Sequence, residues 1–268
     1  MKSSPLLLIK MKKSILIAWA LLMALPGCVT ETTLVGKNSD RTEGKIDTQT
    51  AAKTRLNLAM GYLHKGDMAQ AKFNLDKASE FDPTNPDILL TKAYYFQTVG
   101  DNVGAERSYK EALSQYPNNA DAMNNFGVFL CSNKRYAEAD SQFMRAVEQP
   151  DYIRMEDTYE NAASCAAQSG DKAKAARYFD VALGYSPLNA KLLLEAAELA
   201  LSTNNHTKAA EYMQRFSQGG HDSAQSLWLK LQLAQAQGEL AQLHKYGNDL
   251  VQQFPQSAQA KRYLNNDY

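Results

Sequence analysis

The sequence has few of the residues from which catalytic and metal sites are commonly built. Of its 268 residues, three are cysteine and four are histidine. No histidine stands four residues from another histidine or from a cysteine, so the spacing typical of a helical zinc site is missing. Neither a Walker phosphate loop nor a Gly-x-Ser-x-Gly nucleophile motif occurs. We therefore expect no enzymatic activity, no cofactor and no bound metal.

Positive charge is not in excess either. Lysine and arginine together number 29, and aspartate and glutamate together also number 29. Because nucleic-acid-binding proteins carry clustered basic residues, we expect no nucleic-acid partner. Apolar residues make up 44% of the chain and charged residues 22%, which is ordinary for a soluble folded domain.

Glycine and proline are sparse, at 14 and 8 residues, but many of them recur at a fixed interval. Pro117 follows Pro83 by one period of 34, and Pro187 and Pro255 each follow after two further periods, with two extra residues near Pro150. Between these points, apolar residues follow helical spacing in paired segments. Each pair has one apolar face that it can bury only by stacking on the next pair. The residues in phase are the turn glycines Gly66, Gly100, Gly170 and Gly238 and the closing prolines Pro83, Pro117, Pro187 and Pro255.

Small residues stand where the two helices of each pair would cross. Backbones approach to about 8–10 Å at such crossings, so only a small side chain fits. With an aromatic such as Tyr109 or Phe143 beside the crossing and a closing proline, the repeating pattern resembles the tetratricopeptide repeat. The resemblance implies an all-α superhelix of six helix-turn-helix repeats over residues 52–257, with a short polar capping helix at 258–268. The crossing residues are Ala71, Ala105, Ala139, Ala175 and Ala209.

Two features depart from the repeat pattern. The third and fifth repeats have no turn glycine, and we expect their turns at Lys134 and Asn204. In the sixth repeat, Gly247 stands where an aromatic residue is expected.

The first residues differ in character from the repeats. A positively charged start precedes an apolar run at residues 15–25, too short to span a bilayer but typical of a signal peptide. Leu25-Pro26-Gly27-Cys28 follows and resembles a bacterial lipobox. The resemblance implies a signal peptide at residues 1–27, diacylglycerol on the Cys28 thiol and an acyl chain such as palmitate on the new amino group. A signal peptide cut elsewhere, with Cys28 incidental, is the alternative, and either Met1 or Met11 is the initiator.

The segment after Cys28 indicates a tether. Residues 28–51 are polar, have no apolar period and are expected to be flexible. Without residues 1–27 the chain has 25 basic and 29 acidic residues, a net charge of −4, so acyl chains rather than charge would hold it at a membrane. By analogy with other bacterial lipoproteins, Val29 after Cys28 favours the outer membrane, with the repeats facing the periplasm.

The other two cysteines occupy nearly equivalent positions. Cys131 lies late in the first helix of repeat 3, and Cys165 lies at almost the same place in repeat 4. First helices of consecutive tetratricopeptide repeats lie side by side, so the two Cα atoms can reach the separation of about 5.5–6 Å that a disulfide needs. The periplasm is oxidising, and we expect the bond to persist there. The alternative is a pair of small buried thiols.

The first helices of such repeats line the inside of the superhelix, where we expect a protein-binding groove. Asparagine side chains can bond the main chain of an extended peptide through both carbonyl and amide groups, and an apolar strip runs beside them. For any single residue, contact with solvent or with a neighbouring repeat is the alternative. The basic clamp that some tetratricopeptide repeats use for a terminal carboxylate is not expected, because Leu56 and Met60 occupy the required positions. The groove candidates are Leu56, Asn57, Met60, Leu90, Thr91, Tyr94, Asn124, Asn125, Val128, Asn161 and Ser164.

Three stretches sharpen the resemblance. NNFGVFLCSNKRYAEA in repeat 3, YENAASCAAQSGD in repeat 4 and FSQGGHDSAQSLWL across repeats 5 and 6 are similar to the PilF/PilW family of type IV pilus biogenesis lipoproteins. This resemblance implies a pilotin at the outer membrane. We expect a monomer, because most repeat proteins of this kind can be monomers and the sequence shows no obvious dimer patch. The pilotin would bind the pilus secretin subunit and promote its outer-membrane localisation and multimerisation, with the lipid on Cys28 as the address and the repeats as the binding module.

A second function remains open on the sequence alone. The same architecture suits a periplasm-facing scaffold lipoprotein that organises other envelope machinery, such as peptidoglycan enzymes or outer-membrane assembly. Recovery of hydrolases without secretin from envelope extracts would favour the scaffold.

Overall fold

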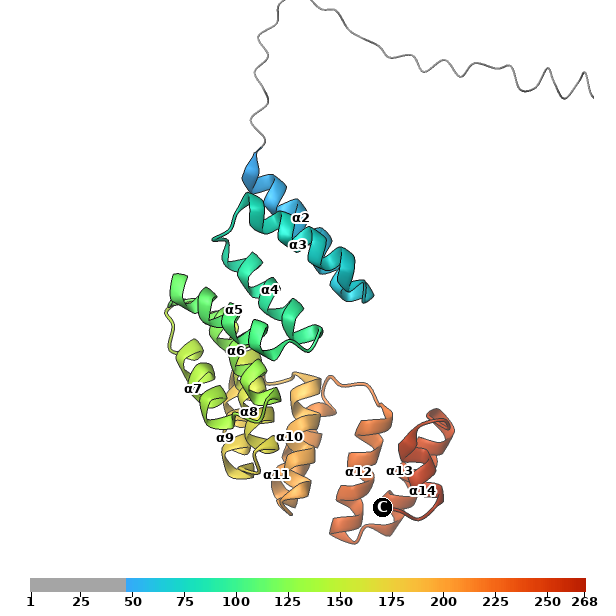
Figure 1. The fold of residues 1–268 in the computed structure, drawn as a ribbon. Helices are drawn as coiled ribbons and strands as arrows, with labels where there is room; N and C mark the ends of the chain where they lie inside the picture. Colours follow the sequence, from blue (N-terminus) through green and yellow to red (C-terminus); the bar gives the residue numbers. More distant parts are fainter. Residues whose placement is uncertain (1–46) are drawn as a thin grey trace, which may run out of the picture. The chain divides into compact units, whose positions relative to one another are not determined.

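The computed structural model describes residues 47–268, which contain thirteen helices and no strand (Figure 1). The signal peptide, Cys28 and most of the tether lie outside the described residues. Twelve helices form six antiparallel pairs that stack in chain order, which confirms the all-α tetratricopeptide-repeat superhelix. The pairs are α2 (Thr48–Lys65) with α3 (Met68–Phe81), α4 (Pro86–Thr98) with α5 (Asn102–Gln115), α6 (Ala120–Ser132) with α7 (Tyr136–Val147), α8 (Met155–Gln168) with α9 (Lys172–Tyr185), α10 (Ala190–Ser202) with α11 (His206–Phe216), and α12 (Ala224–Gln237) with α13 (Leu240–Gln253).

The first helix begins earlier than the sequence indicated. We placed residues 48–51 in the tether, whereas α2 starts at Thr48. The reason is an N-cap, because the carboxylate of Asp47 accepts hydrogen bonds from the backbone N–H groups of Gln49 and Thr50 at 3.1 and 3.3 Å. Asp47 therefore marks the start of the folded repeats.

The turns inside the pairs require a left-handed backbone. The four turn glycines adopt positive φ, which glycine tolerates without a steric penalty. In the two repeats that lack a glycine, Lys134 and Asn204 adopt the same conformation, with φ of 62° and 57°. The repeat phase thus located these turns even where the residue type did not.

Alanines at the crossings are fully buried, as their spacing predicted. Ala71, Ala105, Ala139, Ala175 and Ala209 are each 0% exposed. The aromatics beside them, among them Phe143 and Phe179, fill the wider space and belong to the core.

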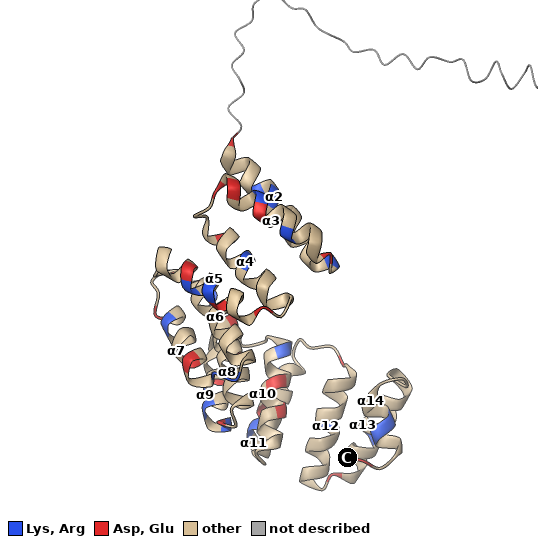
Figure 2. Ribbon diagram, in the orientation of Figure 1, with Lys and Arg blue, Asp and Glu red and all other residues tan. Residues whose placement is uncertain are grey.

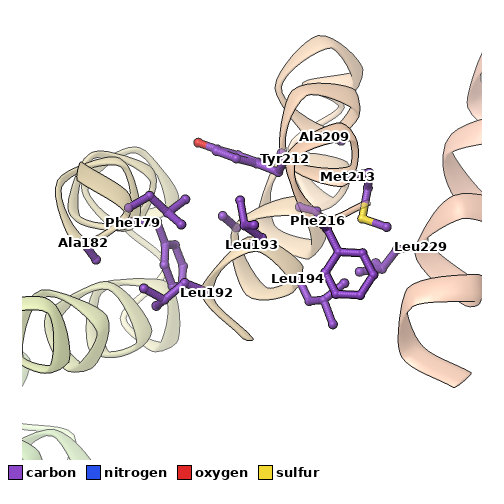
Figure 3. Close-up of a cluster of buried hydrophobic side chains, with 14 of the residues drawn as sticks. Phe179, Ala182, Leu192, Leu193, Leu194, Ala209, Tyr212, Met213, Phe216 and Leu229 are labelled. Carbon is purple, nitrogen blue, oxygen red and sulfur yellow. The ribbon is translucent and has the colours of Figure 1, made fainter. Parts of the chain in front are cut away.

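The core is continuous from one pair to the next. Figure 3 shows one part of it, where Phe179 of α9 meets Leu192 of α10, and Phe216 of α11 lies near Leu229 of α12. Leu192 and Leu229 thus each pack against a residue of the preceding repeat, as expected for pairs that cannot bury an apolar face alone. Such contacts hold the first helices α2, α4, α6, α8, α10 and α12 in a row.

The last open face is covered by α14 (Ala258–Leu264), which packs on α12 and α13. Ala260 of α14 is fully buried in a cluster with Leu231 and Leu250. Within residues 47–268, no helix combines the length and apolarity needed to cross a membrane.

Candidate functional site

The first helices of repeats 1–3 enclose a hollow of about 710 Å³, and a second hollow of about 210 Å³ adjoins it. The two share Met60, Leu90, Thr91 and Asn125. We call this combined surface the apolar groove after its exposed large apolar members, Met60 and Tyr94, at 43% and 49% exposure. The candidates from the sequence that line it are Leu56, Asn57, Met60, Leu90, Thr91, Tyr94 and Asn125.

The groove exposes apolar side chains at one position of successive repeats. Met60, Tyr94 and Val128 occupy equivalent positions one period apart, and all three are more than a third exposed. Met60 and Tyr94 line the groove, whereas Val128 continues the row and lines neither hollow. Large apolar residues that stay exposed in a row mark an interaction surface more often than isolated ones do. The arrangement therefore suits the apolar face of another polypeptide.

Asn124 does not face the groove, contrary to the sequence interpretation. Its side chain is 3% exposed, accepts a hydrogen bond at 3.0 Å from Asn161 Nδ2 and donates one at 3.2 Å to Asn125 Oδ1. A buried amide must be satisfied inside the protein, so Asn124 and Asn161 connect repeats 3 and 4 instead of meeting a peptide. Ser164 is half-buried and lines neither of the two hollows that form the groove.

Thr91 is also less available than expected. Its hydroxyl donates a hydrogen bond at 2.7 Å to the backbone carbonyl of Asp87. With Asn124 and Thr91 engaged internally, the groove amides whose side chains make no hydrogen bond to another described residue are those of Gln49 and Asn57. The groove therefore offers exposed apolar contact at Met60 and Tyr94, with polar side chains around it.

Charged residues at one side of the groove were missed from the sequence. Lys53, Asp87 and Asp121 line the larger hollow and are spaced one period apart, a signal that would have identified them. Arg154 joins them from the loop before α8 and pairs with Asp121 at 3.2 Å and with Asp157 at 2.9 Å. Exposed ion pairs of this kind contribute little to stability. Their effect is on the charge at the edge of the groove.

The structure joins Cys131 of α6 to Cys165 of α8 as a disulfide, with Cα atoms 5.8 Å apart. Both cysteines are buried, and 34 residues separate them. The bond links the first helices of repeats 3 and 4 near their C-terminal ends. It therefore fixes these two neighbouring repeats to each other.

Titratable groups with strongly shifted pKa values lie away from the groove. Burial raises the pKa of Tyr109 to about 12, and Tyr109 packs between helices against Phe126 and Phe129. Across residues 47–268, no three His, Cys, Asp or Glu side chains are grouped to hold a metal ion.

Comparisons with known proteins agree with the repeat architecture. Residues 52–85, 108–141 and 161–224 match family models of the tetratricopeptide repeat. The chain is 30% identical over 249 residues to the type IV pilus assembly protein PilF of Pseudomonas aeruginosa, covering 92% of this chain and 96% of that protein. It is also 40% identical over 121 residues to an uncharacterized protein of Haemophilus influenzae, covering 45% and 68% of the two chains.

Solved structures give the same result. The structure of Pseudomonas aeruginosa PilF is similar with a TM-score of 0.68 at 30% identity, covering 82% of this chain and 99% of that chain. The crystal structure of PilW, a widely conserved type IV pilus biogenesis factor, is similar with a TM-score of 0.70 at 28% identity, covering 80% and 98%.

Proposed function

The chain belongs to the PilF/PilW family of tetratricopeptide-repeat proteins of type IV pilus biogenesis, and from this premise we propose that it is the outer-membrane pilotin of the pilus secretin. In this proposal it acts as a monomer that binds the secretin subunit. Binding promotes both the outer-membrane localisation and the multimerisation of that subunit. The role in pilus biogenesis follows from the family, and the secretin partner is the part to be tested.

The lipid on Cys28 supplies the address in this mechanism. The lipobox-like Leu25-Pro26-Gly27-Cys28 is the support for it, and two or three acyl chains, each buried methylene contributing roughly 0.8 kcal/mol, anchor a protein stably. Residues 29–46 then separate the anchor from the first cap at Asp47. The repeats are thereby held near the membrane without a spanning helix.

The apolar groove holds the client. The observation that carries this step is the exposed row of Met60, Tyr94 and Val128, which is apolar in three successive repeats. Burial of apolar area contributes about 25 cal/mol per Å², so a client that covers these side chains gains affinity from each. A secretin subunit with an exposed apolar segment fits this surface.

The binding step is tested by one charge substitution in the groove and one outside it. Met60→Glu introduces a carboxylate into the apolar row. Val103→Glu is the control. Val103 lies on α5, the second helix of repeat 2, and is 78% exposed, so the same charge is introduced at an apolar position outside the groove. We expect Met60→Glu to abolish co-purification of the secretin subunit and Val103→Glu to preserve it. Equal binding by both variants would exclude the groove.

The targeting step is tested separately with Cys28→Ala. We expect secretin monomers to accumulate in the inner membrane of cells that carry this variant or lack the gene. Normal secretin multimers in the outer membrane of such cells would contradict the pilotin proposal. Blotting of separated membranes with unheated samples measures both quantities.

A further inference from the structure

Met60 has an equivalent residue in the first helix of each later repeat, and these six residues change from apolar to polar halfway along the repeats. The first three are apolar, whereas the last three are polar. The six equivalent residues are Met60, Tyr94, Val128, Ser164, Glu198 and Gln232. The first helices of repeats 5 and 6 therefore present a different surface from those of repeats 1–3.

That surface contains a hollow of about 610 Å³ between α10, α12 and α14, which we call the polar hollow. Its members with side-chain amides come from α12 and α14, with Asn204 added from the turn between α10 and α11. Gln225 donates a hydrogen bond at 3.2 Å to Glu198, and Gln235 donates one at 2.9 Å to the carbonyl of Tyr268. The side-chain amides of Gln232 and Gln259 form no hydrogen bond with any residue in 47–268 and remain free to bond a ligand.

In the polar hollow, neither charged nor apolar side chains are placed to recognise a particular side chain of a ligand. Figure 2 shows α12 almost without charge, and its one charged residue, Lys230, pairs with Asp222 at 2.6 Å. The guanidinium of Arg262 stacks 4.5 Å from the Trp228 ring and also pairs with Asp267 at 3.3 Å. Trp228 is only 7% exposed, so it offers no apolar pocket.

The two charged side chains that line the polar hollow are already engaged, Glu198 with Gln225 and Arg262 with Trp228 and Asp267. The free carboxamides that remain suit a polypeptide backbone. Each carboxamide both donates and accepts, as a peptide group does, and therefore pairs with backbone C=O and N–H groups whatever the side chains are. Three neighbouring helices at about 8–10 Å intervals span roughly 16–20 Å, the length of about five or six extended residues.

We propose that the polar hollow binds an extended segment of the client polypeptide through its backbone, as a second contact beyond the apolar groove. The proposal rests on the function proposed above, since the client is the secretin subunit. The apolar groove recognises apolar side chains, and the polar hollow holds a neighbouring segment with little regard to its sequence. The two contacts together bind one polypeptide across the inner face of the repeats.

Site-specific photo-crosslinking in the full-length protein separates this proposal from the one it rests on. A benzoylphenylalanine replaces Gln232 in the polar hollow, Tyr94 in the apolar groove, or the exposed Arg107 on α5 as the control. We expect secretin adducts from positions 232 and 94 and none from position 107. An adduct from 94 but not from 232 overturns the second contact and leaves the pilotin proposal standing, whereas adducts from neither position overturn both. An adduct from 232 alone supports the polar hollow and excludes the apolar groove.

Backbone recognition is tested on a synthetic peptide that covers the segment crosslinked to position 232. We expect N-methylation of its amide nitrogens to weaken binding at least about fivefold, and alanine replacement of its side chains to change binding less than about twofold. Gln232→Ala with Gln259→Ala should weaken binding about tenfold, since both carboxamides lose their hydrogen bonds to the peptide backbone. Gln253→Ala, exposed on α13, is the control. If N-methylation left binding unchanged while alanine replacement weakened binding strongly, backbone recognition would be overturned.

Discussion

The ring of Tyr263 in α14 lies directly against the backbone of Gly247 in α13, where a Cβ would overlap its ring carbons. The aromatic residue that repeat 6 lacks is therefore supplied by the capping helix. The phenol oxygen of Tyr263 lies 3.5 Å from His244 Nδ1, one turn before Gly247. The glycine and the cap depend on each other, and this relationship can be tested.

Gly247→Ala should destabilise the protein. The added methyl group displaces Tyr263, and overpacking of this kind typically costs about 1–3 kcal/mol. Gly61→Ala is the matched control, since Gly61 lies inside α2 and an added Cβ meets nothing within 4 Å. That control should stabilise by roughly 0.5–1 kcal/mol through helix propensity alone. Urea unfolding followed by circular dichroism measures both, and equal responses would contradict the role of Tyr263.

Gly247 also shows where sequence reasoning stops. The repeat phase identified the position as unusual but not the residue that compensates, because Tyr263 lies outside the period and reaches it only through the packing of α14. Lys134 and Asn204 show the opposite, since the phase located two turns without any glycine. Regular spacing predicts what every repeat shares, and contacts that occur once require the structure.

The groove was predictable to a similar extent. The apolar members Met60 and Tyr94 follow from repeat position alone and lie where the sequence placed them. Asn124 occupies the position equivalent to Leu90, yet its hydrogen bond with Asn161 makes it a buried contact between repeats. The residue type at a repeat position does not show whether an asparagine amide is exposed in the groove or buried between repeats, because its burial depends on the adjacent repeat.

Loss of the Cys131–Cys165 disulfide should lower stability without changing the fold. Closing a 34-residue loop restricts the unfolded chain and contributes about 3–4 kcal/mol in the chain-entropy model. We therefore expect Cys131→Ser with Cys165→Ser to unfold at a lower urea concentration than the parent, with unchanged helical content. Alkylation of both thiols in protein purified without reductant, detected by mass, would show that the bond does not form.

Glu195 should make stability depend on pH. Its Oε2 atom is buried without a hydrogen-bond partner among residues 47–268, and burial raises the pKa of this carboxyl above its ordinary 4.5. Lys191, with Nζ 3.7 Å from the carboxylate, offsets the effect only in part. A raised pKa in the folded state means that the folded protein binds the proton more tightly than the unfolded chain. This contribution to stability is complete below pH 4.5 and is lost as pH rises through the folded-state pKa.

Replacement of Glu195 by glutamine removes that dependence. Glu195→Gln should be more stable than the parent at pH 7, and the difference should shrink toward pH 4. Glu111→Gln, an exposed glutamate on α5, is the control and should not alter the pH profile. Urea midpoints measured at both pH values test this, and parallel profiles for parent and Glu195→Gln would contradict it.

Lys134 and Asn204 adopt the same left-handed conformation but should respond differently to glycine. The left-handed region costs most side chains about 1–2 kcal/mol, whereas asparagine tolerates it because its short amide bonds locally. Glycine removes this cost but adds about 0.4–1 kcal/mol of entropy to the unfolded chain. Lys134→Gly should therefore stabilise by roughly 0.5–1 kcal/mol, and Asn204→Gly by close to nothing. Lys134→Ala keeps the strained backbone and should give no gain, so an equal gain from alanine in urea unfolding would place the cause in the lysine side chain and not in its φ.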